Sequence, residues 1–275
     1  MPDPYYKSKG VQLFHGDCIN ILDSLPKNSV DMIFADPPYF LSNGGISCRA
    51  GKMVCVDKAE WDKSQGFEKD SEFTNNWIKA CRRVLKDNGT IWISGTMHNT
   101  YQVGFSLQKQ DFKLLNEIIW YKPNAPPNLS CKYFAHAHET LLWARKNKDV
   151  PHVFNYDEMR KWDDKISPAG KQMRSIWHIP LTPQIEKLSG KHPTQKPLEL
   201  LKRIILSSTN KGALVLDPFN GSGTTGVVAS MLGREYIGIE KEKDFLKLTL
   251  KRLNINKEHH IILSNYINEG AKNGA

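Results

Sequence analysis

Several features of membrane, secreted and zinc proteins are missing from this sequence. No stretch approaches the ~18 consecutive apolar residues of a membrane-spanning helix, and the first ten residues, MPDPYYKSKG, hold no hydrophobic signal core. The five cysteines, at positions 18, 48, 55, 81 and 131, are odd in number and scattered, with no C-x-x-C pair. They argue against a disulfide framework or a metal site and favour a reducing compartment, so we expect a cytoplasmic protein.

The composition is that of a folded, basic protein. With 275 residues, 40% of them hydrophobic, the chain is long enough to bury one large core or two modest ones. Its formal net charge of +9 suggests a polyanionic partner, most simply nucleic acid. The alternative is a basic protein that its charge merely keeps soluble.

Strands and helices are expected to alternate along most of the chain. The hydrophobic pattern predicts strands over 11–15, 30–35, 90–94, 114–121, 139–144, 213–216 and 236–239. It predicts helices that end near residue 25 and over 72–86, 98–109, 198–208, 224–232 and 243–253, with Asn88-Gly89 closing the second as a left-handed cap. This alternation indicates an α/β fold with a mostly parallel sheet and helices on both faces.

Two stretches lack a clean period. Residues 40–68 are rich in Gly, Ser and Lys, which predicts a mobile loop that closes over a ligand, or else an ordered surface loop. Residues 145–190 mix aromatic and basic side chains and suggest an inserted region or a solvated basic excursion. We therefore divide the chain into 1–144, 145–190 and 191–275, and expect the tail beyond 265 to be loose.

The first chemical signal is FADPPYF at residues 34–40. The apolar run 30–35 predicts a buried strand, and Pro37 and Pro38 forbid further ladder pairing after it. Asp36 and Tyr39 are then displayed on a stiff turn at the carboxyl edge of the sheet, where open parallel sheets bind ligands. A plain strand-ending turn would look the same, because Asp-Pro is common in turns.

The second signal is the glycine-rich run LVLDPFNGSGTTG at residues 214–226. Gly221, Gly223 and Gly226 fit G-x-G-x-x-G between a strand and a helix, and Glu240 follows where a carboxylate can accept ribose hydroxyls. A dehydrogenase is disfavoured, because the spacer 217–220 separates the first glycine from the strand. The 49 residues after Gly226 also leave room for only one strand and one helix. The missing strands must come from the N-terminal half, with 11–15 and Asp17 nearest, so the order is permuted.

The third signal is HPTQKP at residues 192–197. Pro197 suits a first helical turn, and free amides at a helix start can hold a carboxylate. An ordinary proline-rich helix start is the alternative.

Together, DPPY at 36–39, HPTQKP at 192–197 and DPFNGSGTT at 217–225 resemble the S-adenosylmethionine-dependent amino methyltransferases of DNA. Their order is similar to that of the β group, over about residues 10–255. The resemblance implies a circularly permuted, Rossmann-like methyltransferase fold, with 145–190 as the target-recognition region. It also implies a homodimer that acts on double-stranded DNA, with single-stranded DNA left open.

Three longer stretches, at 34–47, 120–130 and 137–146, are most similar to adenine-N6 methyltransferases of restriction-modification systems that act on GATC, and more distantly to those that act on GANTC. The resemblance implies catalysis by the turn Asp36, Pro37, Pro38 and Tyr39, with Asp36 and the Pro37 carbonyl accepting from the target amine and Tyr39 stacking on the base. It implies that S-adenosylmethionine contacts Asp17, Cys18, Asp36, Thr194, Gln195, Lys196, Asp217, Phe219, Gly221, Ser222, Gly223, Thr224, Thr225 and Glu240.

For DNA contacts we select four basic residues of the recognition region, Arg160, Lys161, Lys171 and Arg174. An N4-cytosine methyltransferase remains the main alternative, although Asp as the first residue of the tetrapeptide favours adenine. A protein or RNA methyltransferase and a non-catalytic DNA-binding protein are weaker alternatives. The sequence does not reveal the recognition code, the strand preference, the oligomeric state or a partner nuclease.

Overall fold

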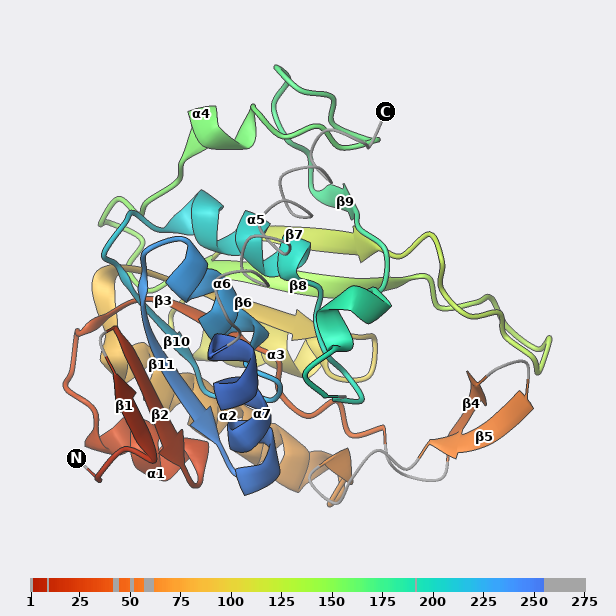
Figure 1. Ribbon diagram of the computed structural model, residues 1–275, viewed down its shortest axis with the longest axis horizontal. Helices are drawn as coiled ribbons and strands as arrows, with labels where there is room; N and C mark the ends of the chain where they lie inside the picture. The colour runs from red at the N-terminus through yellow and green to blue at the C-terminus, as the bar shows by residue number, and fades with distance from the viewer. Residues whose placement is uncertain are drawn as a thin grey trace.

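A twisted, mostly parallel sheet forms the centre of the molecule in the computed structural model, which describes residues 2–8, 10–41, 45–49, 52–56, 62–190 and 192–254 (Figure 1). In spatial order its strands are β1 (Tyr6–Ser8), β2 (Val11–His15), β11 (Glu235–Glu240), β10 (Leu214–Asp217), β3 (Val30–Ala35), β6 (Leu85–Gly95), β8 (His138–Arg145), β7 (Lys113–Tyr121) and β9 (Ile176–His178). The run from β2 to β6 is parallel, β8 is antiparallel to both its neighbours, and β9 runs parallel to β7.

Strands from opposite ends of the chain interleave in this sheet. β11 pairs in parallel with β2, with Gly238 opposite Leu13, and β10 pairs in parallel with β3. The predicted permuted α/β fold is therefore confirmed. Because the parallel strands end at one edge, Asp17, Asp36, Asp217 and Glu240 come together there.

Helices cover both faces of the sheet, as predicted. The helices are α1 (Cys18–Ser24), α2 (Phe67–Val84), α3 (Thr100–Lys109), α4 (Tyr156–Met159), α5 (Leu198–Ser208), α6 (Thr224–Met231) and α7 (Lys243–Leu253), with a 3-10 turn over Gln184–Lys187. One apolar core lies under α5, α6 and α7, in front of the sheet in Figure 1, and a second lies under α1, α2 and α3. Each core takes alternate side chains of the same strands, for example Phe34 and Ile33 of β3.

The predicted end of the helix over 72–86 is wrong. The helix stops at Val84, and the residues after it, including Gly89, belong to β6. Tertiary contacts cap the helix instead, since the N–H groups of Asn28 and Ser29 donate to the carbonyls of Arg83 and Val84. Gly89 is needed for close packing, because a Cβ there would lie 2.9 Å from the Lys86 carbonyl oxygen.

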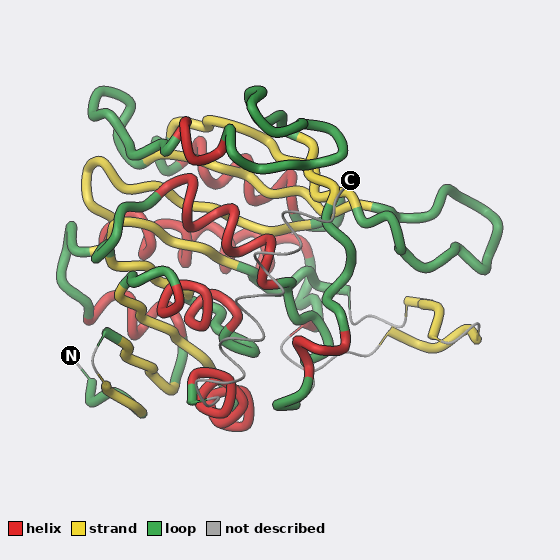
Figure 2. The backbone as a smooth tube through the Cα atoms, turned by 45° about the horizontal axis from the view of Figure 1, so that its top comes forward, coloured by secondary structure: helices red, strands yellow, loops and turns green. Residues whose placement is uncertain are grey.

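Within the aperiodic stretch 40–68, an antiparallel hairpin pairs β4 (Gly45–Arg49) with β5 (Lys52–Val56). Residues 42–44, 50, 51 and 57–61 lie outside the described residues, so the predicted mobility stays a prediction. The tail beyond 265 also lies outside them. In Figures 1 and 2 this hairpin and the segment 122–137, which joins β7 to β8, both project from the sheet beside one another.

The segment 145–190 is loop-rich and packs on the main body. It supplies β9 to the edge of the sheet, and Trp177 joins the core under α5. The buried Asp164 carboxylate accepts from Arg203 of α5 at 2.7 Å, which ties the segment to that helix. None of the helices in the described part of the chain is both long and apolar enough to cross a bilayer.

Candidate active site

A cavity of about 630 Å³ opens at the carboxyl edge of the sheet. Its wall combines the turn after β2, the turn after β3, the glycine loop after β10, the end of β11 and the segment before α5. The carboxylates of Asp17, which follows β2, and of Asp217 and Glu240, which end β10 and β11, line it together with Phe219 and Phe245. The topology thus gathers one site from both ends of the chain.

Asp17 and Cys18 lie where β2 turns into α1. The Asp17 Oδ1 atom caps the helix by accepting from the N–H groups of Ile19 and Asn20, both at 3.0 Å. Cys18 is buried, and burial raises the pKa of its thiol to about 12, which excludes a thiolate there at neutral pH.

Glu240 and Asp217 fix the glycine loop by hydrogen bonds to their carboxylates. The Glu240 Oε2 atom accepts from the Gly221 N–H at 2.7 Å, and Asp217 accepts from the Thr225 hydroxyl at 2.6 Å and the Phe219 N–H at 3.0 Å. Burial raises the pKa of Asp217 to about 7 against these hydrogen bonds, and burial also raises the pKa of Glu240. Both carboxylates would gain from a ligand that brings hydroxyl or cationic groups.

Not every predicted loop residue faces the cavity. Gly221, Ser222, Thr224 and Thr225 line it, whereas Gly223 turns toward α7, with φ of +73°. A Cβ at Gly223 would lie 2.4 Å from Thr249 Cγ2, so this glycine serves the packing of the loop.

Arg252 of α7 fixes the loop from behind, and the sequence analysis missed it. Its Nη1 atom donates to the Ser222 carbonyl at 2.8 Å and to the Thr224 hydroxyl at 2.8 Å. Burial lowers the pKa of this guanidinium to about 10, which still leaves it charged at neutral pH. A basic residue in the last turn of a terminal helix carries no distinctive sequence signal.

The turn after β3 is held by a second residue that the sequence analysis missed. Asp62 is buried, and its Oδ1 atom accepts from the N–H groups of Tyr39, at 2.8 Å, and Phe40, at 3.0 Å. Its Oδ2 atom accepts from the Leu41 N–H. Asp62 therefore clamps the turn in the shape that directs Asp36 into the cavity.

Lys196 lies against Asp36. Its Nζ atom is 2.6 Å from Asp36 Oδ2 and 3.5 Å from Glu139 Oε2, and its side chain is only 6% exposed. The Tyr39 hydroxyl lies 2.7 Å from Asp36 Oδ1 and 2.8 Å from Ser94 Oγ. Glu139 in turn accepts from Lys122 at 2.9 Å.

The other residues of 192–197 divide between two directions. His192 and Thr194 line the cavity with Lys196. Gln195 does not. Its side-chain amide donates to the Glu186 carbonyl at 2.8 Å, and its backbone carbonyl accepts from the Thr182 hydroxyl. The side chain of Gln195 thus points away from the cavity, and its predicted cofactor contact stays a prediction.

Comparison with known proteins gives the chemistry of this arrangement. A family model described as DNA methylase matches residues 30–251. The chain belongs to this family. It is 54% identical over 259 residues to the type II methyltransferase M2.DpnII of Streptococcus pneumoniae. The aligned region covers 94% of this chain and 95% of that protein. It is 51% identical to M2.MboI of Moraxella bovis, over 90% of each chain.

Solved structures agree with the fold. The crystal structure of an M1.HpyAVI–SAM complex superposes with a TM-score of 0.65 at 29% identity, covering 89% of this chain and all of that one. The cytosine-N4-specific PvuII methyltransferase gives a TM-score of 0.69 at 20% identity, covering 97% of this chain and 95% of that one, which supports the fold alone. This DNA methylase therefore has the predicted Rossmann-like methyltransferase fold and depends on S-adenosylmethionine.

The cavity fits that cofactor by the chemistry of its wall. Its carboxylates suit hydroxyl and ammonium groups. Phe219, edge-on to Trp77 at 5.3 Å between ring centroids, and Phe245, edge-on to His192 at 4.3 Å, offer apolar surface for a ring system. The residues of this DNA methylase are thus compatible with a charged nucleoside ligand.

The four basic residues chosen for DNA contact lie outside the cavity wall. The Arg160 guanidinium donates to the Gly170 carbonyl at 2.9 Å, and the Arg160 backbone carbonyl accepts from the Gly170 N–H. These two hydrogen bonds bring Lys171 close to Arg160. Lys161 pairs with Glu158 at 2.7 Å, and Arg174 accepts from the Trp177 indole through its carbonyl. All four lie within 145–190 on a solvent-facing loop cluster.

Proposed function

We propose that this DNA methylase transfers a methyl group from S-adenosylmethionine to N6 of adenine, within GATC, as part of a restriction-modification system. The position of Asp36 carries the proposal, because its carboxylate lies in the cavity wall at the end of the DPPY turn. The type II relatives support a role in restriction-modification, and the similarity of residues 34–47, 120–130 and 137–146 to adenine methyltransferases supports GATC.

Asp36 and the turn around it would make the target amine reactive. The amine is a poor nucleophile, because its lone pair is delocalised into the adenine ring. Asp36 accepts one N–H and the Pro37 carbonyl the other, which localises the lone pair, and Pro38 and Asp62 keep the turn rigid. The bound cofactor supplies the methyl group as a sulfonium. The methylated nitrogen then loses a proton to Asp36 or to water.

Tyr39 would take part in two ways. Tyr39 is one of the residues that line the cavity, which supports stacking on a base that has left the helix. Its hydroxyl is bonded to Asp36, so it would also fix the carboxylate.

For the cofactor, we assign Asp217, Glu240 and the loop Phe219–Thr225, with Asp17, Cys18 and Thr194 beside them. Asp17 would accept from the cofactor adenine, and Glu240 would hold its ribose. The raised pKa values of Asp217 and Glu240 support a site that is completed by ligand donors.

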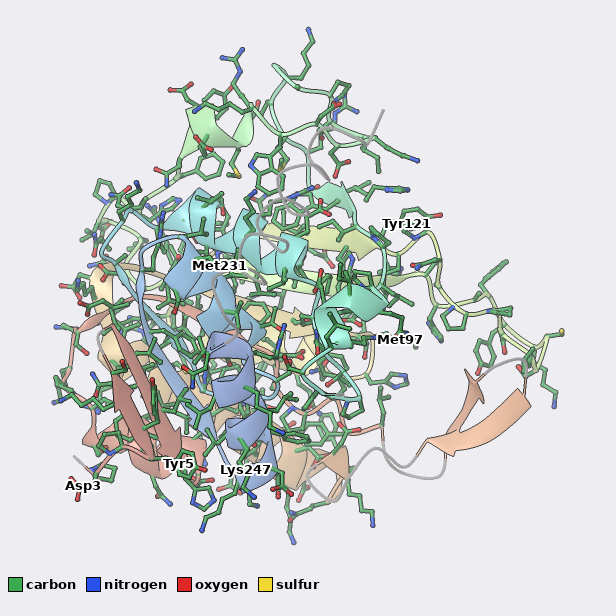
Figure 3. The ribbon with its side chains drawn as sticks, in the orientation of Figure 1. Asp3, Tyr5, Met97, Tyr121, Met231 and Lys247 are labelled. Atoms are coloured by element: carbon green, nitrogen blue, oxygen red, sulfur yellow. The ribbon has the colours of Figure 1, made fainter. Side chains whose placement is uncertain are left out.

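DNA would approach the carboxyl edge of the sheet. The segment 122–137 projects there after Tyr121, which Figure 3 labels at its start. It presents Tyr133 and Phe134, which are 60% and 96% exposed, and no acidic residue occurs between Lys122 and His138. Aromatic and basic side chains without acids suit stacking on bases and contact with phosphates. This segment would share DNA binding with 145–190.

We also expect a cytoplasmic homodimer. Tyr101 and Phe105 are one helical turn apart on α3 and are 78% and 68% exposed, which supports a protein interface there. Sedimentation of the free protein and of a Phe105→Glu variant tests this, since the variant is expected to sediment as a monomer.

Modified-base sequencing tests the function directly. Plasmid DNA from cells that express the chain, and otherwise lack adenine methylation, should carry N6-methyladenine at GATC. DNA from cells that express Asp36→Ala should not. N4-methylcytosine in a nucleoside digest, or N6-methyladenine at GANTC alone, would replace the proposal by one of its alternatives.

A further inference from the structure

A buried network of four charged side chains surrounds the catalytic turn. Asp36 directly follows β3, Lys122 follows β7, Glu139 is the second residue of β8 and Lys196 precedes α5, so four separate segments meet at the same edge. All four side chains are at least four-fifths buried. Two carboxylates and two ammonium groups sum to zero charge, so the buried network is electrically neutral.

The contacts fix the plane of the Asp36 carboxylate. Lys196 donates to Oδ2 at 2.6 Å, and the Tyr39 hydroxyl donates to Oδ1 at 2.7 Å. A carboxylate with a donor on each oxygen cannot rotate without breaking one of these hydrogen bonds. Because an ionised carboxylate has about four acceptor positions, it keeps capacity for a further N–H.

Glu139 holds the two donors in place. Its Oε2 atom lies 3.5 Å from Lys196 Nζ and accepts from Ser94 at 3.3 Å, and Ser94 is hydrogen-bonded to the Tyr39 hydroxyl. Burial would raise the pKa of Glu139, but Lys196 and Lys122 hold it at about 2. Burial and the two nearby carboxylates raise the pKa of Tyr39 well above its usual range, so the hydroxyl keeps its proton.

We propose that Lys196 and Glu139 are positioning residues of methyl transfer, which hold Asp36 as an oriented, ionised acceptor for the target amine. The proposal rests on the catalytic role of Asp36 given above. It moves Lys196 from the cofactor, to which the family resemblance had assigned it, to the catalytic carboxylate. Glu139 acts through Lys196 and Tyr39, and Lys122 balances its charge.

Removing Lys196 should change the protonation of the network. In Lys196→Met, Asp36 and Glu139 remain buried near each other, and Lys122 is the remaining cation of the four-residue network. A buried excess of negative charge favours uptake of a proton. A proton taken up by the network weakens it as a hydrogen-bond acceptor at low pH, so kcat should recover as the pH rises and the proton leaves. Asp217, Glu240, Lys63 and His192 also face this part of the cavity and are unchanged in the variant.

The test compares pH profiles of kcat on saturating DNA and cofactor. Lys196→Met should lower kcat by about a hundredfold or more, the scale for removing a preorganised hydrogen bond, and shift its ascending limb to higher pH. Lys196→Met/Glu139→Gln removes the excess charge and should return the limb toward the wild-type position. Lys196→Arg should keep the wild-type profile at a lower rate. The matched control is Lys86→Met. It breaks a Lys–Asp ion pair, with an N–O distance of 2.7 Å, that lies outside the cavity wall.

Cofactor affinity, measured by equilibrium titration, separates this inference from the alternative. Lys196→Met should bind S-adenosylmethionine within about threefold of wild type, because Asp217, Glu240 and the glycine loop hold it. A loss of affinity with an unshifted profile would make Lys196 a cofactor residue and overturn the proposal.

Two further outcomes keep the test decisive. If Lys196→Met does not fold, Lys196→Arg and Glu139→Gln decide the matter, because both keep a cation beside Asp36. Lys196→Arg should keep the wild-type limb, and Glu139→Gln, which leaves one excess positive charge in the network, should have its limb at or below the wild-type pH. A limb shifted to higher pH in either variant would overturn the proposal. An active Asp36→Ala would instead refute the proposed function itself.

Discussion

Asp217 should make the affinity for S-adenosylmethionine depend on pH. Burial raises the pKa of this carboxylate to about 7, although the Thr225 hydroxyl and the Phe219 N–H both donate to it. The cofactor carries a sulfonium and an ammonium group, which favour an ionised carboxylate in the cavity wall. Binding near neutral pH should therefore release a proton from Asp217.

The size of the effect follows from the pKa. At pH 7 about half of Asp217 is ionised and at pH 6 about one eleventh, so the Kd should rise by about fivefold between pH 7 and pH 6. Above about pH 8 the Kd should be constant. Burial also raises the pKa of Glu240, which adds to the dependence in the same direction.

Unfolding of the protein should not mimic this result. A pKa raised above the ordinary value of 3.8 means that the folded protein binds the Asp217 proton more tightly than the unfolded chain. This group therefore stabilises the fold at low pH, and its contribution is lost as the pH rises from about 4 toward 7. Acidification through the titration of Asp217 weakens cofactor binding while it stabilises the free protein.

Calorimetry in two buffers of different ionisation enthalpy measures both the Kd and the protons released. Tryptophan fluorescence gives a second measurement, because Trp77 packs against Phe219 in the cavity wall. Asp217→Asn should bind more weakly, with a reduced pH dependence, and Asp244→Asn, at an exposed site on α7, should behave as wild type. A constant wild-type Kd between about pH 6 and pH 8 would refute the assignment of Asp217 as a cofactor ligand.

Three further outcomes are expected. Asp36→Ala should bind the cofactor within about tenfold of wild type but lose about two to four orders of magnitude in kcat, and near-normal turnover would reduce DPPY to a strand-ending turn. Gly223→Asp should abolish cofactor binding and lower the Tm, because its Cβ would meet Thr249 at 2.4 Å, and a wild-type Tm would contradict that packing. Neutralising the four basic residues Arg160, Lys161, Lys171 and Arg174 should weaken DNA binding. The slope of log affinity against log salt should fall by about 0.9 for each phosphate that they contact in the wild type, and an unchanged slope would exclude these residues as DNA contacts.

The sequence predicted the fold where its signals are local. The apolar run 30–35 before two prolines, and the strand–glycine loop–helix at 214–226, have strong patterns of their own, and both form as expected. The permuted strand order followed from a simple count, since too few residues remain after the glycine loop for a complete sheet. The pairing of β11 with β2 confirms it.

Elsewhere tertiary contacts decided the outcome. Asn88-Gly89 looks like a helix end, yet the helix is capped by Asn28 and Ser29, which lie more than 50 residues earlier. The Gly-rich stretch 40–68 has no period, but backbone pairing forms a hairpin within it. Asp62 accepts from backbone N–H groups, and Arg252 donates to the Ser222 carbonyl and the Thr224 hydroxyl, which any acidic or basic residue could do in principle.

Lys196 shows most clearly how a contact can escape sequence analysis. The family resemblance assigned it to the cofactor, and along the chain it is about 25 residues from the glycine loop but 160 from Asp36. The permuted sheet reverses this relation, because it places the start of α5 over the end of β3. Gln195 and Lys196 then face opposite ways, one toward the Glu186 carbonyl and one toward Asp36. The stretch HPTQKP therefore joins Gln195, which binds the Glu186 carbonyl, to Lys196, which contacts Asp36, and only contacts between distant segments separate the two.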